Sequence, residues 1–175
     1  MKHKIAIGVL ASALVAGPAV QAQEAATAAG AAPTEARPAA EQPRYGQQKV
    51  VYHFNAYDAK AQAAGLGNIQ NHINAVGAEN LEVRVVMHGD GLSLLLYPDA
   101  VAQTKMKEGN ATEQMQSRIA SLKEQGVRFD ICANTLNGRQ VRFEDLYDAR
   151  EGDIVPSGVA ELSHLQSMGY TYVKP

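Results

Sequence analysis

The sequence alternates short apolar runs with helix-compatible segments, and three of these segments end at a glycine just before a new apolar run. The three junctions are Val76-Gly77, Gln125-Gly126 and Met168-Gly169. Glycine readily adopts the left-handed backbone conformation that ends many helices, so each junction predicts a helix end followed by a strand. Strands that alternate with helices are typical of βαβ units. We therefore expect a small α/β domain, in which an open, mostly parallel sheet carries helices on both faces in flavodoxin-like layering.

Four apolar runs predict the main strands. They are KVVYHF (49–54), LEVRVVM (81–87), VRFDIC (127–132) and YTYV (170–173). The run LSLLLYP (92–98) allows three interpretations: an edge strand, a short helix, or a surface that contacts another subunit. The segment 141–156 predicts a short helical turn, a loop and a brief strand.

Helical periodicity predicts three helices. The predicted apolar stripes are Ile69, Ile73 and Val76; Met115, Ile119 and Leu122; and Val159, Leu162 and Leu165. Asn110 and Glu113 have capping-box spacing and predict the start of the second helix. Ser157 predicts the cap of the third helix.

The first 22 residues have the layout of a secretory signal peptide. Lys2 and Lys4 precede an apolar run over 5–16, and small residues stand at the expected cleavage position. Residues 23–47 are mainly Ala, Glu, Pro, Gln and Gly, which bury little apolar surface, so we expect a disordered tether. Residues 48–175 then form one domain. The protein is expected to be periplasmic or secreted.

Charge and hydropathy argue against two kinds of partner, nucleic acids and membranes. Without Lys2 and Lys4 the chain has 14 basic and 18 acidic side chains. No basic cluster is interleaved with aromatic residues, so nucleic-acid binding is not expected. No later segment has the roughly 20 apolar residues that a membrane-spanning helix needs, so no membrane association is expected after signal cleavage.

Chemically capable side chains follow three predicted strands. The first strand ends with His53 and Asn55, the second is followed by His88 and Asp90, and the third ends at Cys132, with Asn134 and Thr135 after it. Ligands of open parallel sheets bind outside the carboxyl ends of the strands. If the strands are neighbours, this edge of the sheet forms one binding site. His72 and His164 fall on predicted helices and are interpreted as packing or surface residues.

Cys132 is the only cysteine, so it cannot form an internal disulfide. Between a strand and a helical turn it faces free backbone N–H groups, which stabilise a thiolate, and a nearby charged histidine would add to this effect. The alternative interpretation is a small buried core residue. The chain lacks close metal-ligand spacing, phosphate loops and dinucleotide fingerprints, so no metal and no cofactor are predicted.

The segments VRFDICANTLNGR (127–139), VVMHGDGLSLL (85–95) and IVPSGVAELSHLQSMGYTYVKP (154–175) resemble the DsrE/DsrF-like family. The resemblance covers 49–175 and implies a parallel α/β domain that assembles into homotrimers or homohexamers. In sulfur-relay members, the cysteine that follows an isoleucine at the end of a strand carries a persulfide. The resemblance implies that role for Cys132, which follows Ile131. Those members are cytoplasmic and have small apolar residues where this chain has Asn134 and Thr135.

Two functions follow from these observations. The first is a periplasmic sulfur-handling protein of sulfurtransferase-like character, in which Cys132 accepts or carries sulfur as a persulfide. Its partners would be a small sulfur donor or an acceptor protein. The second is a non-catalytic oligomeric module that binds a ligand or metal at the strand-end crevice.

Overall fold

The computed structural model describes residues 44–175, in which five strands form one parallel sheet. The strands are β1 (Gln48–Phe54), β2 (Leu81–Met87), β3 (Arg128–Cys132), β4 (Ile154–Val155) and β5 (Thr171–Val173). The helices are α1 (Ala59–Val76), α2 (Glu113–Glu124), α3 (Ala133–Arg139) and α4 (Gly158–Ser167). Short 3₁₀ turns are η1 (Ala78–Asn80), η2 (Gly89–Leu94), η3 (Pro98–Gln103), η4 (Phe143–Asp145) and η5 (Glu151–Asp153). The predicted signal peptide, and the predicted tether up to residue 43, lie outside the described residues.

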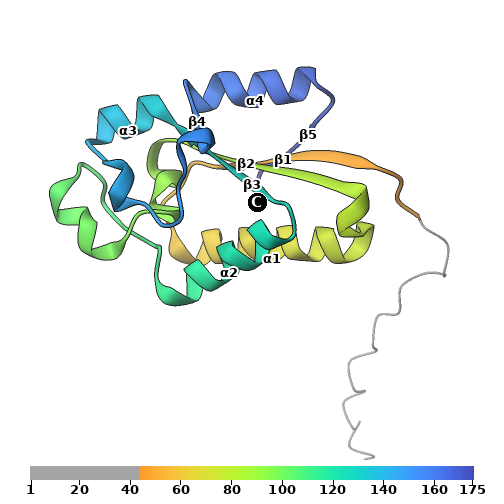
Figure 1. Ribbon diagram of the computed structural model, residues 1–175, viewed down its shortest axis with the longest axis horizontal. Helices are drawn as coiled ribbons and strands as arrows, with labels where there is room; N and C mark the ends of the chain where they lie inside the picture. The colour runs from red at the N-terminus through yellow and green to blue at the C-terminus, as the bar shows by residue number, and fades with distance from the viewer. Residues whose placement is uncertain (1–43) are drawn as a thin grey trace, which may run out of the picture. The chain divides into compact units, whose positions relative to one another are not determined.

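The strand order is β4-β3-β2-β1-β5, and every neighbouring pair is parallel. The chain therefore moves across the sheet from β1 to β4 and then returns to place β5 on the free side of β1. Right-handed crossovers require that this reversal moves the connecting helix to the opposite face. Figure 1 shows this arrangement, with α1 and α2 below the sheet and α4 above it. The predicted open parallel sheet with helices on both faces is confirmed.

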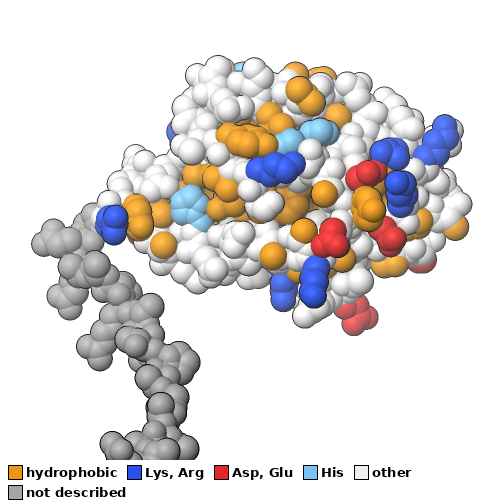
Figure 2. Space-filling view, turned by 180° about the vertical axis from the view of Figure 1, so that it is seen from behind, with side chains coloured by type: hydrophobic (Ala, Val, Ile, Leu, Met, Phe, Trp, Pro, Cys, Tyr) orange, Lys and Arg blue, Asp and Glu red, His pale blue; other side chains and the backbone are white. Residues whose placement is uncertain are grey.

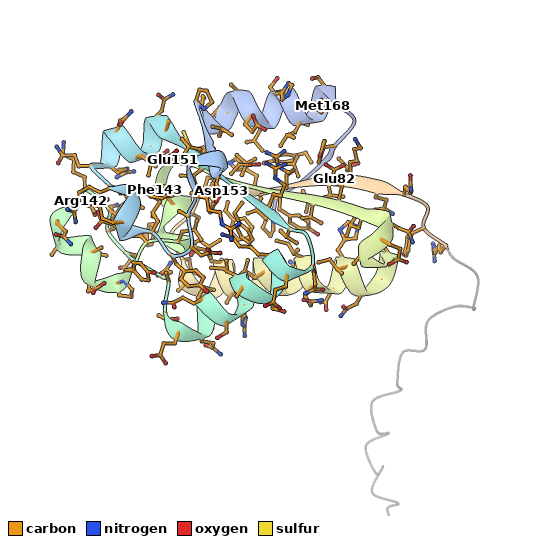
Figure 3. The ribbon with its side chains drawn as sticks, in the orientation of Figure 1. Glu82, Arg142, Phe143, Glu151, Asp153 and Met168 are labelled. Carbon is orange, nitrogen blue, oxygen red and sulfur yellow. The ribbon has the colours of Figure 1, made fainter. Side chains whose placement is uncertain are left out.

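Each face of the sheet has its own apolar core, because successive strand residues point to opposite faces. The larger core joins one face of β1, β2 and β3 to α1 and α2; its buried residues include Tyr52, Phe54, Leu66, Ile69, Val85, Met87, Ile119 and Phe129. The smaller core joins the other face to α4 and contains Val51, Val86, Leu162, Leu165 and Tyr170. Figure 3 shows side chains filling the space on both faces. The Tyr170 hydroxyl also donates a hydrogen bond to Glu82 on β2, which that figure labels.

The glycines that predicted the helix ends do have left-handed backbones. The φ angles of Gly77, Gly126 and Gly169 are 89°, 90° and 89°. Each glycine is followed within a few residues by a strand. The repeated junction was therefore a correct guide to the α/β alternation.

The predicted cap of α2 is wrong. Thr112, not Asn110, precedes the helix and accepts a hydrogen bond from the backbone N–H of Met115. Asn110 is buried, and its side-chain amide donates to the Tyr57 carbonyl and to Gln62 Oε1 at 2.7 and 2.8 Å. Asn110 thus satisfies buried polar groups instead of capping the helix.

Val159 was predicted to point inward on α4, and this is also wrong because 64% of it is exposed. Ser157 caps the helix as predicted, accepting from the Ala160 N–H. The buried stripe of α4 runs through positions 158, 162 and 165. Counting back four residues from Leu162 leads to Gly158, so Gly158 rather than Val159 faces the sheet.

The run 92–98 belongs to the core of its own domain. Its first part lies in η2, and Leu96 forms a β-bridge with Leu146. The leucines at 92, 94, 95 and 96 are all 0% exposed. Of the three interpretations, the short helix is confirmed for its first part, and a surface that contacts another subunit is excluded. The segment 141–156 contains the predicted helical turns and the brief strand β4. No described helix reaches the length and apolar content needed to cross a bilayer.

Two glycines of α1 provide a matched test of this packing. A Cβ on Gly65 would lie 2.7 Å from the Phe54 ring, whereas a Cβ on Gly67 would meet nothing within 4 Å. We expect Gly65→Ala to lower the free energy of unfolding by about 1–3 kcal/mol through overpacking. Gly67→Ala should raise it by up to about 1 kcal/mol through helix propensity. Urea unfolding of both variants tests the pair, and equal effects would contradict the packing of α1 on Phe54.

Candidate functional site

The three predicted strand ends do lie side by side, because β1, β2 and β3 are neighbours. Phe54 pairs with Met87, and Met87 pairs with Ile131. These three residues point into the larger core. The alternation of side chains therefore places His53, His88 and Cys132 on the opposite face, which α4 covers.

His53 and His88 form a direct hydrogen bond. Their Nε2 atoms are 2.7 Å apart, the ring centroids are 4.7 Å apart, and the ring planes differ by 26°. On its other side His53 Nδ1 lies 2.7 Å from the Tyr172 hydroxyl, contributed by β5. One ring must donate and the other accept across the Nε2 pair, so these side chains form a continuous hydrogen-bonded chain across β5, β1 and β2.

Burial disfavours the protonated form of both imidazoles. Burial, followed by the neighbouring His88 and Lys174, lowers the pKa of His53 from 6.5 to about 4. Burial and Lys174 also lower the pKa of His88. A charged histidine would have added to the stabilisation of the Cys132 thiolate, but the lowered pKa values of both rings do not favour that condition.

The turn after β2 is held tightly on the end of β1. The backbone N–H of His88 donates to the Phe54 carbonyl at 3.2 Å. A Cβ on Gly91 would lie 2.1 Å from that same carbonyl oxygen, so only glycine allows this approach. The turn therefore fixes the position from which the His88 ring reaches His53.

The same turn is tied to α3. The backbone N–H of Gly89 donates to Thr135 Oγ1 at 2.9 Å, and Arg139 Nη2 donates to Asp90 Oδ1 at 2.7 Å. Asp90 therefore has a structural partner. Together these bonds hold α3, and with it the residues that follow Cys132, against the end of β2.

Cys132 is 4% exposed but belongs to neither apolar core. Burial alone would raise the pKa of its thiol. That effect is outweighed by hydrogen bonds from the Thr135 hydroxyl and from the backbone N–H groups of Gly158, Thr135 and Asn134, so that the pKa lies below its ordinary value. These four donors, which we call the sulfur nest, make the core interpretation of Cys132 incomplete: it is buried among donors.

The direction of the Thr135 hydroxyl bond is fixed by its neighbour. Thr135 Oγ1 accepts from the Gly89 N–H, and its own proton is then free to donate to the Cys132 sulfur. A hydroxyl in this position favours thiolate over thiol because bonds to charged acceptors are the stronger ones.

Replacing Thr135 tests the sulfur nest. Thr135→Val removes the hydroxyl donor at nearly constant volume, so we expect the pKa of Cys132 to rise by about one unit, or ~1.4 kcal/mol. Thr135→Ser keeps the donor and should leave the pKa within a few tenths of a unit of the wild-type value. The ultraviolet absorbance of the thiolate against pH measures both, with Cys132→Ser as the blank. An unchanged pKa in Thr135→Val would contradict the role of the hydroxyl.

An ion-pair cluster fixes the first turn of α4 above the sheet. Arg84 donates to both carboxylate oxygens of Asp130, from Nε at 2.8 Å and from Nη2 at 2.5 Å. Arg84 Nη2 also lies 3.3 Å from Glu161 of α4. The three side chains are 14%, 3% and 16% exposed. Because α4 is bonded here to β2 and β3, the N–H of Gly158 stays at the sulfur of Cys132.

Removing Arg84 should be costly. Arg84→Met leaves the buried Asp130 carboxylate without its cation, so we expect the free energy of unfolding to fall by about 3 kcal/mol. Adding Asp130→Asn removes the orphaned charge, and the double variant should recover part of this loss. Chemical denaturation of the single and double variants measures both effects. A loss below about 1 kcal/mol for Arg84→Met would show that the cluster does not hold the two strands and α4 together.

An open groove of about 620 Å³ borders the histidine pair. It lies between the sheet and α4 and is lined by His53, His88, Val159, Leu162, Ser163, Gln166 and Tyr172. Figure 2 shows one face of the molecule, on which pale blue histidine side chains lie among hydrophobic ones and a blue Lys or Arg side chain lies beside one of them. The chain of rings can therefore be reached from outside.

Cys132 lies at the inner border of this arrangement. A Cβ on Gly158 would lie 2.9 Å from His88 Cβ and 3.3 Å from Cys132 Cβ. The two residues are thus neighbours on either side of one glycine, but the His88 ring points toward His53. The site has two halves, the sulfur nest and the histidine pair.

The other predicted site residues have narrower roles. Asn55 Oδ1 accepts from Lys174 Nζ at 2.5 Å, at the edge of the site. Asn134 contributes its backbone N–H to the sulfur nest, and its side chain is exposed. Of the two helix histidines, His72 is hydrogen-bonded to the Tyr52 hydroxyl and to Gln48 Oε1, as expected for a packing residue. His164 is exposed on α4, as expected for a surface residue.

Sequence reasoning missed Tyr172, Gly158 and Lys174. The position of β5 beside β1 brings Tyr172 to His53, and no local pattern indicates that strand order. A sequence signal for Gly158 did exist: glycine is a poor helix former, yet it stands directly after Ser157, which predicts the start of a helix. In the described part of the chain, no group of three or more His, Cys, Asp or Glu side chains is arranged to hold a metal ion.

Comparisons with known proteins agree with this fold. Residues 48–175 match the sequence model of the DsrE/DsrF-like family. The structure of the protein of unknown function MTH1491 from Methanobacterium thermoautotrophicum is similar with a TM-score of 0.58 and 27% identity, covering 74% of this chain and 100% of that one. The ychN protein from E. coli has a TM-score of 0.51 and 17% identity, covering 74% and 99%, and supports the fold alone. The comparison with curated proteins found no match.

Proposed function

This chain belongs to the DsrE/DsrF-like family, and we propose that it is a sulfur-handling protein in which Cys132 accepts and carries sulfur as a persulfide. The family is associated with sulfur relay, and the resemblance of VRFDIC (127–132) to its relay members implies that Cys132 corresponds to their persulfide-bearing cysteine.

The observation that carries the proposal is the sulfur nest. Four hydrogen-bond donors converge on one sulfur atom that is otherwise buried. Such donors stabilise a negative charge, whether it is on a thiolate or on the outer sulfur of a persulfide. An inert core cysteine needs no such partners, because it packs as a small apolar side chain.

The step needs no external oxidant. The Cys132 thiolate attacks the outer sulfur of a donor of the thiosulfate or persulfide class and forms a new S–S bond with its electron pair. The S–S bond of the donor breaks, and that electron pair leaves with sulfite or with the donor thiolate. An acceptor thiolate then attacks the outer sulfur of the Cys132 persulfide, and the Cys132 thiolate leaves.

The setting of this activity is also proposed. The layout of residues 1–22 supports export to the periplasm or beyond, and the composition of 23–47 supports a tether. The resemblance supports a homotrimer or homohexamer, and a small sulfur donor or an acceptor protein would be the other partner.

Mass spectrometry after incubation with thiosulfate or glutathione persulfide tests the proposal. The folded wild type should gain the mass of one sulfur atom on Cys132, because the thiolate attacks the donor. Cys132→Ser should gain nothing, since a serine hydroxyl is a far weaker nucleophile at neutral pH. Cyanolysis of the adduct should release thiocyanate and restore the original mass.

A labelling control makes a negative result informative. Complete alkylation of Cys132 in urea establishes that the thiol was reduced and able to react. With that control satisfied, no sulfur adduct from any of the donors would overturn the persulfide role. Survival of ligand binding and of oligomer mass in Cys132→Ser would then favour the non-catalytic binding module.

A further inference from the structure

The two halves of the site present opposite chemistry. The sulfur nest directs N–H and O–H hydrogens at one atom and so favours an anion. The histidine pair directs two Nε2 atoms at each other, 2.7 Å apart and in nearly parallel rings. A hydrogen bond between two imidazole nitrogens needs one N–H donor and one lone-pair acceptor, so a single proton lies between the two Nε2 atoms.

We propose that the Nε2 atoms of His53 and His88 form a binding site for one soft monovalent metal ion, with Cu(I) as the ion that this pair suits. Imidazole nitrogen is a common ligand of copper, and d¹⁰ Cu(I) accepts two ligands in a linear arrangement. The ion takes the place of the shared proton between the two rings. This site is separate from Cys132 and does not depend on persulfide chemistry.

The surroundings favour a monovalent ion over Zn²⁺. Lys174 lines the same small pocket as His53 and donates to Asn55 at the end of β1, so a positive charge already lies beside the pair. In the part of the chain that the structure describes, no third His, Cys, Asp or Glu joins the two rings. A dication would therefore lack both the carboxylate charge and the additional ligands that a tetrahedral site requires.

Binding requires a small, specified rearrangement. Two metal–nitrogen bonds of about 2 Å place the nitrogens about 4 Å apart, so the rings must separate by roughly 1.3 Å. The open groove on the side of α4 leaves room for this movement. The proton between the rings moves to Nδ1 of the ring that carried it, and both Nε2 lone pairs then face the ion.

Tyr172 supports this tautomer at His53. Its hydroxyl lies 2.7 Å from His53 Nδ1 and can accept from that nitrogen as readily as donate to it. Hydrogen bonds of this kind orient metal-binding imidazoles and raise their basicity. We therefore assign Tyr172 as a positioning residue for the ion, without direct contact to it.

Anaerobic titration of the Cys132→Ser protein with Cu(I), against a chromophoric Cu(I) chelator, tests the site without the thiol. We expect one bound ion per chain. His53→Ala or His88→Ala in the same background should weaken binding by at least 100-fold, and Tyr172→Phe by about 10-fold. His164→Ala is the matched control, because His164 is exposed on α4, and it should bind as the parent does.

X-ray absorption at the copper edge gives a second readout. Two nitrogen scatterers near 2 Å with no sulfur are expected in the wild-type protein. Failure of Cys132→Ser to bind Cu(I), binding that His53→Ala and His88→Ala leave unchanged, or a sulfur atom bonded to the ion would each overturn the proposal. These outcomes are independent of the persulfide assay, which reports on Cys132 in metal-free protein.

Discussion

The close contact between the first turn of α4 and the sheet is the constraint on which the site depends. Gly158 lies where any side chain would collide with His88, and its N–H reaches the sulfur of Cys132. The buried Arg84–Asp130–Glu161 cluster holds the first turn of α4 close to β2 and β3. A bulkier residue at 158 would push α4 away from the sheet, and the sulfur nest would lose a donor while the groove beside the histidine pair widened.

The reversal in strand order, from β4 at one edge of the sheet to β5 at the other, explains why this contact exists. The helices between β1, β2 and β3 lie on one face, so the other face is free when the chain leaves β4. The helix α4 covers that face only in part, because it has ten residues, while α1 has 18. The incomplete cover leaves a groove along the strand ends. Polar and ionisable residues remain accessible there without lying in an apolar core.

Most of the fold, but only part of the site, could be predicted from the sequence. Apolar runs and glycine junctions are local features, and they predicted the strands, the helix ends and the α/β class correctly. The edge that gathers His53, His88 and Cys132 also followed from the general behaviour of parallel sheets. Strand order is a property of the whole chain, so the contribution of Tyr172 from β5 could not be predicted.

Other errors arose where two local interpretations were close. Asn110 is a residue type that often caps helices, but here its side-chain amide donates to the carbonyl of Tyr57 and to the buried Gln62 Oε1 instead. Val159 is apolar and adjacent to the true inward position, and a shift of one residue turns a helical side chain by about 100°. The ionisation of the histidines depends on burial by α4 and on Lys174, which no spacing in the sequence reports.

The placement of β5 has a consequence for biosynthesis. His53 and Tyr172 are hydrogen-bonded although 119 residues separate them along the chain, and β5 is synthesised after the other four described strands. Contacts that distant form late, after most of the entropy of loop closure has been overcome. A nascent chain that has already formed β1 to β4 therefore still lacks the Tyr172 phenol that orients the His53 ring, and the hydrogen-bonded chain of rings is complete only after β5 has been made.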